Sequence, residues 1–313
     1  MEQNWREEIV EVPYGQIACK VWRKGTDNEN CCKIIAIHGW QDNAGTFDCL
    51  IPLLNFDCVV VAVDMPGHGL SSHLPNGILY TDCNYLLDIK RVIDHFGWTK
   101  ISFMGHSMGG MIALYFASVF PDEVEFIICL DVLKPLTCEA TKIAESIQTT
   151  LNTFINVEKK ILSPRTQTYT FAEATRRLIE AHSLFGLITE ESAQILLKRG
   201  ASKTEGNCYV FNRDLRLRSL LFTRQTDETL ISYFSRLKCN LLVIIAEKGV
   251  KHDDDEVQKK FLKVYSEYAK RFKFVAIDGE HHIHLNNASA VVPYINDFIF
   301  DCYLKNGDVH NGV

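Results

Sequence analysis

The stretch Gly105-His106-Ser107-Met108-Gly109, followed directly by Gly110, decides the fold of this chain. It has the form Gly-x-Ser-x-Gly, in which a sharp turn between a strand and a helix lifts the serine side chain clear of the backbone. Such a turn holds the serine in a strained conformation, so the residues two before and two after it must carry almost no side chain. Gly105 and Gly109 meet that requirement.

The residues on either side of this stretch fit a strand, a turn and a helix. Residues 100–104 have the composition of a short buried strand, and residues 111–117 carry an apolar helical pattern. A small-residue turn between two buried elements is the simpler alternative. The flanking strand and helix favour a nucleophile elbow, which presents Ser107 as the reactive group.

Composition and charge exclude several classes of protein. The chain has 313 residues, enough for one large domain or two smaller ones, and 47% of them are apolar, as in ordinary globular proteins. The net charge of −6 provides no basic field, so we expect no nucleic-acid partner. The longest apolar runs have the length of strands, so we expect no integral membrane association.

The chain ends and the cysteines predict a cytoplasmic location. Residues 1–8 lack the basic start and apolar stretch of a signal peptide, and residues 310–313 are not a peroxisomal Ser-Lys-Leu tail. The 11 cysteines are odd in number and include no Cys-x-x-Cys pair. We therefore expect reduced thiols, with neither a disulfide framework nor a zinc site built on cysteine.

Strands and helices alternate along most of the chain. An antiparallel hairpin is predicted for residues 8–13 and 16–24, where apolar and polar residues alternate. The later strands are continuous apolar runs separated by helical patterns, which favours an α/β fold with a doubly wound, mostly parallel sheet. The predicted strands cover residues 33–37, 58–63, 100–104, 124–130, 240–246 and 273–277; the predicted helices cover residues 47–54, 82–96, 111–117, 254–271 and 288–304, with a frayed tail after the last.

The pattern changes in residues 134–239. Helical stretches dominate there and no apolar run has the length of a strand. We interpret this segment as a helical cap, or lid, inserted between the sixth and seventh strands, over the carboxyl edge of the sheet where open α/β folds bind ligands. Residues 1–133 and 240–313 would then form the core. The predicted cap helices cover residues 141–161, 171–184, 190–199 and 227–237.

A serine nucleophile needs an imidazole to take its proton and a third group to orient that imidazole. After an elbow of this type the acid and then the histidine follow the serine along the chain. The loop after the last strand offers His281, His282 and His284. The pair His281 and His284 resembles an arrangement in related hydrolases, which often carry a second histidine three residues beyond the catalytic one; this resemblance favours His281, with His282 as the alternative. Because these histidines match no known ligand motif, we expect no metal and no cofactor.

The acid that would orient the imidazole is harder to assign than the serine or the histidine. The turn after residues 240–246, where an aspartate is usual, reads Ala-Glu-Lys-Gly and ends in Gly249. The three aspartates at 253–255 fit a helix cap better than a catalytic acid. Asp131 ends the preceding predicted strand, 24 residues after Ser107. It is the predicted acid because it resembles the acid that some hydrolases with an elbow of this type carry on that strand. The alternative is that Asp131 merely terminates its strand.

The negative charge that develops on the substrate oxygen needs two backbone N–H groups. The residue after the nucleophile, Met108, supplies one, and Trp40, in the loop after the third strand, supplies the other. Gly39 lets the backbone approach the substrate, and the Trp40 ring is expected to form a pocket wall. Three other histidines in the motif loops are predicted to be structural hydrogen-bonding groups: His38, His68 and His106.

Taken together, the motif blocks resemble the α/β-hydrolase superfamily. The blocks are His-Gly-Trp-Gln-Asp-Asn at 38–43, Asp-Met-Pro-Gly-His-Gly-Leu-Ser-Ser-His at 64–73 and the elbow at 105–110. Within the superfamily the chain resembles the serine hydrolase-like proteins over nearly its whole length, which implies a serine hydrolase with no agreed substrate. The subgroup resemblance also rests on residues 199–200, 211–214, 246–249 and 281–285.

One segment, residues 124–135, resembles the strand of haloalkane dehalogenases that carry an acid at the position of Asp131. Those enzymes have an aspartate nucleophile followed by tryptophan, whereas this chain has Ser107-Met108. Dehalogenation and epoxide opening are therefore disfavoured.

The sequence favours hydrolysis of an ester or thioester with a small apolar acyl group, through an acyl-enzyme. Ser107 would attack, His281 would carry the proton, and Asp131 would hold the imidazole. A small-ligand-binding protein without turnover is the alternative, motivated by the glycine at 249. A lyase or a cofactor-free oxygenase on the same scaffold is the third hypothesis for the function.

Overall fold

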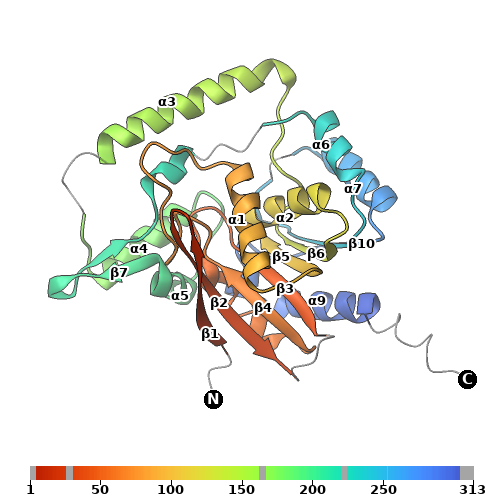
Figure 1. The fold of residues 1–313 in the computed structure, drawn as a ribbon, viewed down its shortest axis with the longest axis horizontal. Coiled ribbons are helices and arrows are strands. Elements are labelled where there is room, and N and C mark those ends of the chain that lie inside the picture. Colours follow the sequence, from red (N-terminus) through yellow and green to blue (C-terminus); the bar gives the residue numbers. More distant parts are fainter. Residues whose placement is uncertain (1–4, 26–30, 162–166, 220–223, 252, 304–313) are drawn as a thin grey trace, which may run out of the picture.

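The computed structural model describes residues 5–25, 31–161, 167–219, 224–251 and 253–303. Within these residues eight strands form one sheet in the order β1-β2-β4-β3-β5-β6-β9-β10 (Figure 1). Strand β2 pairs antiparallel with both β1 and β4, and all the other pairs are parallel. The predicted α/β fold with a mostly parallel sheet is confirmed. The strands are β1 Trp5–Val12, β2 Gly15–Lys24, β3 Cys32–Ile37, β4 Cys58–Val63, β5 Ile101–His106, β6 Val124–Leu130, β9 Asn240–Ala246 and β10 Arg271–Ile277.

Helices cover both faces of this sheet. Because successive residues of a strand point to opposite faces, alternate side chains enter two different cores. On β3, Ile35 and Ile37 join the core formed with α1, α2, α6 and α7, whereas Ile34 and Ala36 join the core formed with α9. Figure 1 shows α1 and α2 on one side of the strands and α9 on the other. Burial on both faces explains why these strands read as continuous apolar runs. The helices are α1 Asp82–His95, α2 Met108–Val119, α6 Asp227–Phe234, α7 Asp255–Tyr268, α8 Ile283–Asn286 and α9 Ala288–Tyr303.

The segment between β6 and β9 also holds α3 Ile143–Ile161, α4 Phe171–His182 and α5 Glu190–Gly200. Figure 1 shows α4 and α5 gathered on one flank of the sheet, with α3 running along the outside. A small separate core joins α4 and α5 through side chains such as Leu178 and Leu196. Within the described residues, no helix here or elsewhere is both long and apolar enough to cross a lipid bilayer.

Helices dominate the segment between β6 and β9, as predicted. The segment also holds a two-stranded sheet that the sequence does not predict, formed by β7 Ala201–Lys203 and β8 Tyr209–Phe211. Each strand has only three residues and β7 is mostly polar, so neither gives a strand signal.

The helix expected over 47–54 is replaced by two short 3₁₀ helices, Ala44–Phe47 and Ile51–Leu53. Pro52 lacks the N–H that one continuous helix would need. Phe47 and Leu50 are nevertheless buried, as the apolar pattern requires. The predicted frayed tail, residues 304–313, lies outside the described residues.

Candidate active site

The elbow has the strained geometry that its sequence predicts. Ser107, between β5 and α2, has φ 49° and ψ −115°. A Cβ atom on Gly105 would lie 2.5 Å from the carbonyl oxygen of Gly109, and one on Gly109 would lie 2.5 Å from the carbonyl carbon of Ile37. Any side chain at these two positions would therefore force the elbow away from α2 or from β3.

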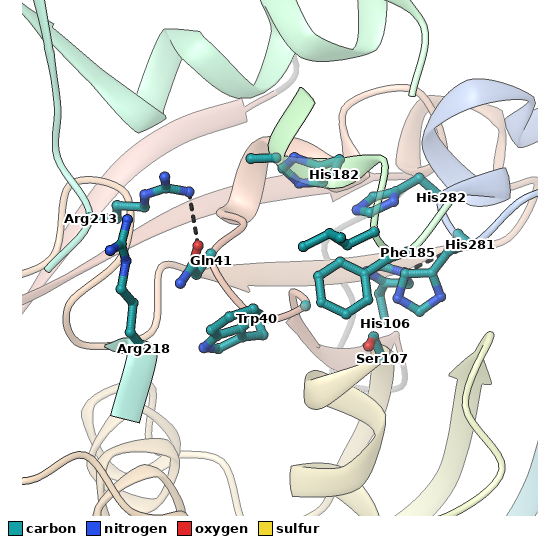
Figure 2. A pocket seen from close by; sticks show the side chains of 13 residues that line it. Trp40, Gln41, His106, Ser107, His182, Phe185, Arg213, Arg218, His281 and His282 are labelled. Atoms are coloured by element: carbon teal, nitrogen blue, oxygen red, sulfur yellow. Dashed lines mark hydrogen bonds between the residues drawn. The ribbon is translucent and has the colours of Figure 1, made fainter. Parts of the chain in front are cut away.

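A cavity of about 420 Å³ lies over the elbow and is lined by both Ser107 and His281. Figure 2 shows Ser107 at the elbow, below the rings of His281 and Phe185. Within the described part of the chain the Ser107 hydroxyl makes no hydrogen bond, to His281 or to any other residue, so the shared cavity is what brings Ser107 and His281 together. The lining residues are Gly39, Trp40, Gln41, His106, Ser107, Ala181, His182, Leu184, Phe185, Arg213, Arg218, His281 and His282.

Asp131 and His281 are in direct contact. The distance from His281 Nδ1 to Asp131 Oδ2 is 2.5 Å, and both side chains are buried. The other carboxylate oxygen, Oδ1, accepts a hydrogen bond of 2.8 Å from the Ala246 amide. Since Nδ1 donates to the carboxylate, Nε2 is left with the lone pair that a general base needs. His282, the alternative base, contacts Asp42 instead.

Gly249 is glycine because the Asp131 carboxylate occupies the space beside it. A Cβ atom at 249 would lie 2.6 Å from Asp131 Oδ1 and 2.7 Å from Cγ, and closer still to Oδ2. The other acidic candidates are engaged elsewhere. Asp254 caps α7, as expected for this run, and Asp253 lies 2.8 Å from Lys134 Nζ.

The two backbone amides expected to bind an oxyanion come from different elements. Met108 is the first residue of α2, at the electropositive helix end, and Trp40 follows β3. In the described ranges neither of these amides donates a hydrogen bond. The Trp40 ring lines the cavity, held by a 2.9 Å hydrogen bond from Nε1 to the Leu217 carbonyl and by edge contact with Phe185.

Comparison with known proteins agrees with this geometry. A family model described as alpha/beta hydrolase fold matches residues 34–288. The chain belongs to the α/β-hydrolase family. Within it, the chain belongs with the serine hydrolase-like proteins, because two such relatives are each 33% identical to it. One, from Drosophila melanogaster and named probable serine hydrolase, aligns over 95% of this chain and 88% of its own length. The other, a serine hydrolase-like protein of Danio rerio, aligns over 96% and 90%.

A solved structure shows the same fold along almost the whole chain. It is a hypothetical protein of Pseudomonas aeruginosa, 27% identical, with a TM-score of 0.79; the match covers 94% of this chain and 99% of that one. Fold and relatives together support assignment of this α/β-hydrolase family member as a hydrolase.

Buried histidines hold the loops of the site in place through hydrogen bonds. His106 Nε2 donates to the carbonyl oxygen of His281 at 3.0 Å, which ties the elbow to the loop carrying the base. Burial, reinforced by the neighbouring imidazoles, lowers the pKa of His106 well below its usual value, so the ring is neutral. His38 and His68 were also predicted to be structural hydrogen-bonding groups, and this is confirmed. His38 Nε2 accepts a hydrogen bond from the Met65 amide, and His68 Nε2 accepts one from the Gln41 amide.

Asp42, His106 and His282 are the described residues best placed to hold a metal ion, with one donor atom from each within 4.8 Å of the others. Asp42 Oδ2 lies 3.6 Å from His282 Nε2 and 3.9 Å from His106 Nδ1. Burial alone would raise the pKa of Asp42, but contact with His282 outweighs it and the net pKa is lowered. Asp42 therefore stays ionised and anchors His282 away from Asp131.

A buried ion pair connects the segment between β6 and β9 to the sheet. Arg199, at the end of α5, donates from Nη2 to Asp64 Oδ2 at 2.9 Å and also contacts Glu7. Burial opposes the charge on Arg199, but these two carboxylates raise its pKa overall. Asp64 also accepts the amides of Ala44 and Leu70, so it fixes both motif loops.

Several cavity residues were missed by sequence reasoning. Arg213 belongs to a block that supported the family resemblance, but the block itself suggested no role. Arg218, His182 and Phe185 come from helical or irregular stretches whose sequence carries no motif. Only the packing of the segment between β6 and β9 beside the elbow brings them together (Figure 2).

Proposed function

We propose that the chain is a serine hydrolase that cleaves esters or thioesters, with Ser107 as nucleophile, His281 as general base and Asp131 as the acid that orients His281. The observation that carries the proposal is the 2.5 Å contact of Asp131 with His281 Nδ1 beside a cavity that Ser107 and His281 both line. This contact occupies Nδ1 of the base and leaves Nε2 outside it, available to take a proton from a serine.

In the proposed reaction, His281 Nε2 takes the Ser107 hydroxyl proton as the oxygen attacks the acyl carbon. The resulting oxyanion accepts hydrogen bonds from the amides of Trp40 and Met108; loss of one such donor typically costs about 3 kcal/mol of barrier. The bond to the alcohol or thiol then breaks, and protonated His281 gives its proton to the leaving group. Water, activated by the same imidazole, hydrolyses the acyl-enzyme and restores Ser107.

The segment 134–239 is proposed to act as the cap of this enzyme, with residues 1–133 and 240–313 as the core. Support comes from the cavity lining, to which the segment contributes His182, Phe185, Arg213 and Arg218. Covering the elbow would exclude bulk water from the acyl-enzyme except for the hydrolytic molecule.

The substrate is proposed to be a small molecule with an apolar acyl part. Trp40, Leu184 and Phe185 give the cavity apolar walls close to Ser107, and a volume of about 420 Å³ suits a small ligand. A binding protein without turnover was suggested by the glycine at 249, where an aspartate is usual. The closeness of position 249 to the Asp131 carboxylate favours the enzyme, because the acid is supplied from another strand.

The proposal is tested with a fluorophosphonate probe and with p-nitrophenyl esters of graded chain length. Wild type should be labelled and should hydrolyse short esters, and Ser107→Ala should lose both properties. Ser232→Ala, which alters an exposed serine on α6, is the matched control and should behave as wild type. A folded wild type that is neither labelled nor active, or labelling that persists in Ser107→Ala, would overturn the proposal.

A further inference from the structure

A second cavity, of about 800 Å³, lies next to the one that contains Ser107. The two cavities share Ala181, Arg213 and Arg218 as lining residues, so they are neighbouring parts of one hollow. Figure 2 shows Arg213 and Arg218 at the end of the first cavity opposite Ser107 and His281, with Trp40 and Gln41 between. A ligand that extends from Ser107 past the Trp40 ring would meet both guanidinium groups.

The second cavity is strongly basic, although the whole chain carries a net charge of −6. Its lining includes Arg213, Arg218, Arg177 and Lys160 against two carboxylates, those of Glu180 and Asp214. The Asp214 charge is already neutralised, because Arg216 contacts it at 2.7 Å through Nη2. Two of the four cations, Arg213 and Arg218, line both cavities and therefore lie where the cavities meet.

Arg213, which is partly buried, differs from the two buried arginines of the described chain. Arg199 and Arg216 each contact a carboxylate, whereas Arg213 has only a neutral partner, donating from Nη1 to Gln41 Oε1 at 2.9 Å. Its guanidinium lies 5.3 Å from the centre of the Phe211 ring. Burial, and then the charge of Arg218, lower the pKa of Arg213.

Arg218 makes no hydrogen bond or ion pair with any residue that the structure describes. Two guanidinium groups that face one cavity without a carboxylate repel each other, and an anion placed between them would relieve that repulsion. Guanidinium groups also match carboxylate and phosphate oxygens in geometry, often through paired hydrogen bonds.

We propose that Arg213 and Arg218 form a subsite for an anionic group of the substrate, so that the enzyme acts on esters or thioesters whose far end carries a carboxylate or a phosphate. This inference rests on the proposed function, because it takes Ser107 as the point of bond cleavage. The apolar walls beside Ser107 would hold the carbon chain, and the arginine pair would select the charged end.

The test compares matched ester pairs. Mono-p-nitrophenyl esters of succinic, glutaric, adipic and pimelic acids each carry a terminal carboxylate. The neutral controls are the same p-nitrophenyl esters with that carboxylate converted to its methyl ester, which have nearly the same shape. A second comparison sets butyryl-coenzyme A against a neutral butyryl thioester. In butyryl-coenzyme A the anionic groups belong to the leaving group and not to the acyl part. Wild type should prefer the charged member of at least one pair by about tenfold or more in kcat/KM, mainly through KM. The pair that shows the preference identifies the side of the bond on which the anion lies.

Arg213→Gln and Arg218→Gln should each remove most of that preference, and Arg213→Lys should retain part of it because the charge remains. Arg236→Gln is the matched control: it changes an exposed arginine of the same segment that lines neither cavity, and the preference should be unaffected. Thermal unfolding of each variant confirms that it is folded. Equal rates for charged and neutral esters in wild type, or an unchanged preference in both glutamine variants, would overturn the inference.

Binding to Ser107→Ala separates failure of this inference from failure of the proposed function. Calorimetric titration of this variant with each intact ester needs no turnover. Tighter binding of the charged ester, lost on adding Arg213→Gln, supports the subsite even if wild type proves inactive. Labelling of wild type by the fluorophosphonate probe together with equal binding of both esters would reject the subsite and leave the hydrolase intact.

Discussion

Gly249→Ala should inactivate the enzyme without unfolding it. The new Cβ atom would lie 2.6 Å from Asp131 Oδ1 and 2.7 Å from Cγ, whereas ordinary contacts begin at 3.4 Å. The carboxylate must therefore move by at least about 0.8 Å at Oδ1 and by more at Oδ2, and it cannot move toward His281, whose Nδ1 is already at 2.5 Å. It must turn away from the base that it orients.

The size of the effect follows from the role of that contact. Misplacement of a catalytic group by about 1 Å can cost about 10²-fold in rate, and loss of the orienting acid in a serine triad costs about 10⁴-fold. We expect kcat for p-nitrophenyl butyrate to fall between these limits, and the rate of fluorophosphonate labelling to fall with it. Gly200→Ala is the control, because its Cβ would meet only the end of the Asn43 side chain, at 3.2 Å.

A reciprocal exchange sharpens the test. Asp131 has φ 49°, a backbone region that glycine adopts readily, so Asp131→Gly should fold but lose activity. Adding Gly249→Asp to that variant returns a carboxylate to the same space and should recover part of the lost kcat. A Gly249→Ala enzyme with wild-type kcat, or an exchange variant no better than Asp131→Gly alone, would refute the assignment of the acid.

Three further outcomes are expected. Asp131→Asn should reduce kcat by about 10³- to 10⁴-fold while melting like wild type in calorimetry; a small change would assign the acid elsewhere. Arg199→Met leaves Asp64 buried without its cation and should lower the unfolding free energy in urea by about 3–5 kcal/mol, whereas an unchanged midpoint would contradict the ion pair's importance. Burial lowers the pKa of His182 to about 4 from 6.5, so the unfolded chain binds the extra proton between these values. Stability should therefore fall by about 3 kcal/mol from this group as pH drops from 6.5 to 4, and urea titrations of His182→Gln should show a shallower pH slope; parallel slopes would exclude the effect.

The part of the site that follows a local rule could be predicted from sequence. The elbow depends on two glycines at fixed spacing from Ser107, and the structure shows why any Cβ there would clash. Buried strands read as apolar runs because helices cover both faces of the sheet. Asp131 was predicted from its place at the end of a strand, and its contact with His281 supports the proposal that it is the acid.

The remainder depends on contacts between distant segments. Arg213 and Arg218 reach the cavity only because the segment between β6 and β9 packs beside the elbow, and the sequence shows no periodicity that reports this. The two 3₁₀ helices on either side of residues 48–50 show that local sequence patterns can also mislead. Their apolar residues have the spacing of one α-helix, but Pro52 lacks the N–H that a continuous helix would need.

The most direct measurement is the intact mass of the protein after rapid acid quenching of its reaction with p-nitrophenyl acetate. A population heavier by one acetyl group, mapped by peptide sequencing to Ser107 and absent from Ser107→Ala, is the predicted result. Turnover of the ester with no acetylated protein at any quench time, or acetylation at another residue that sustains turnover, would contradict the account.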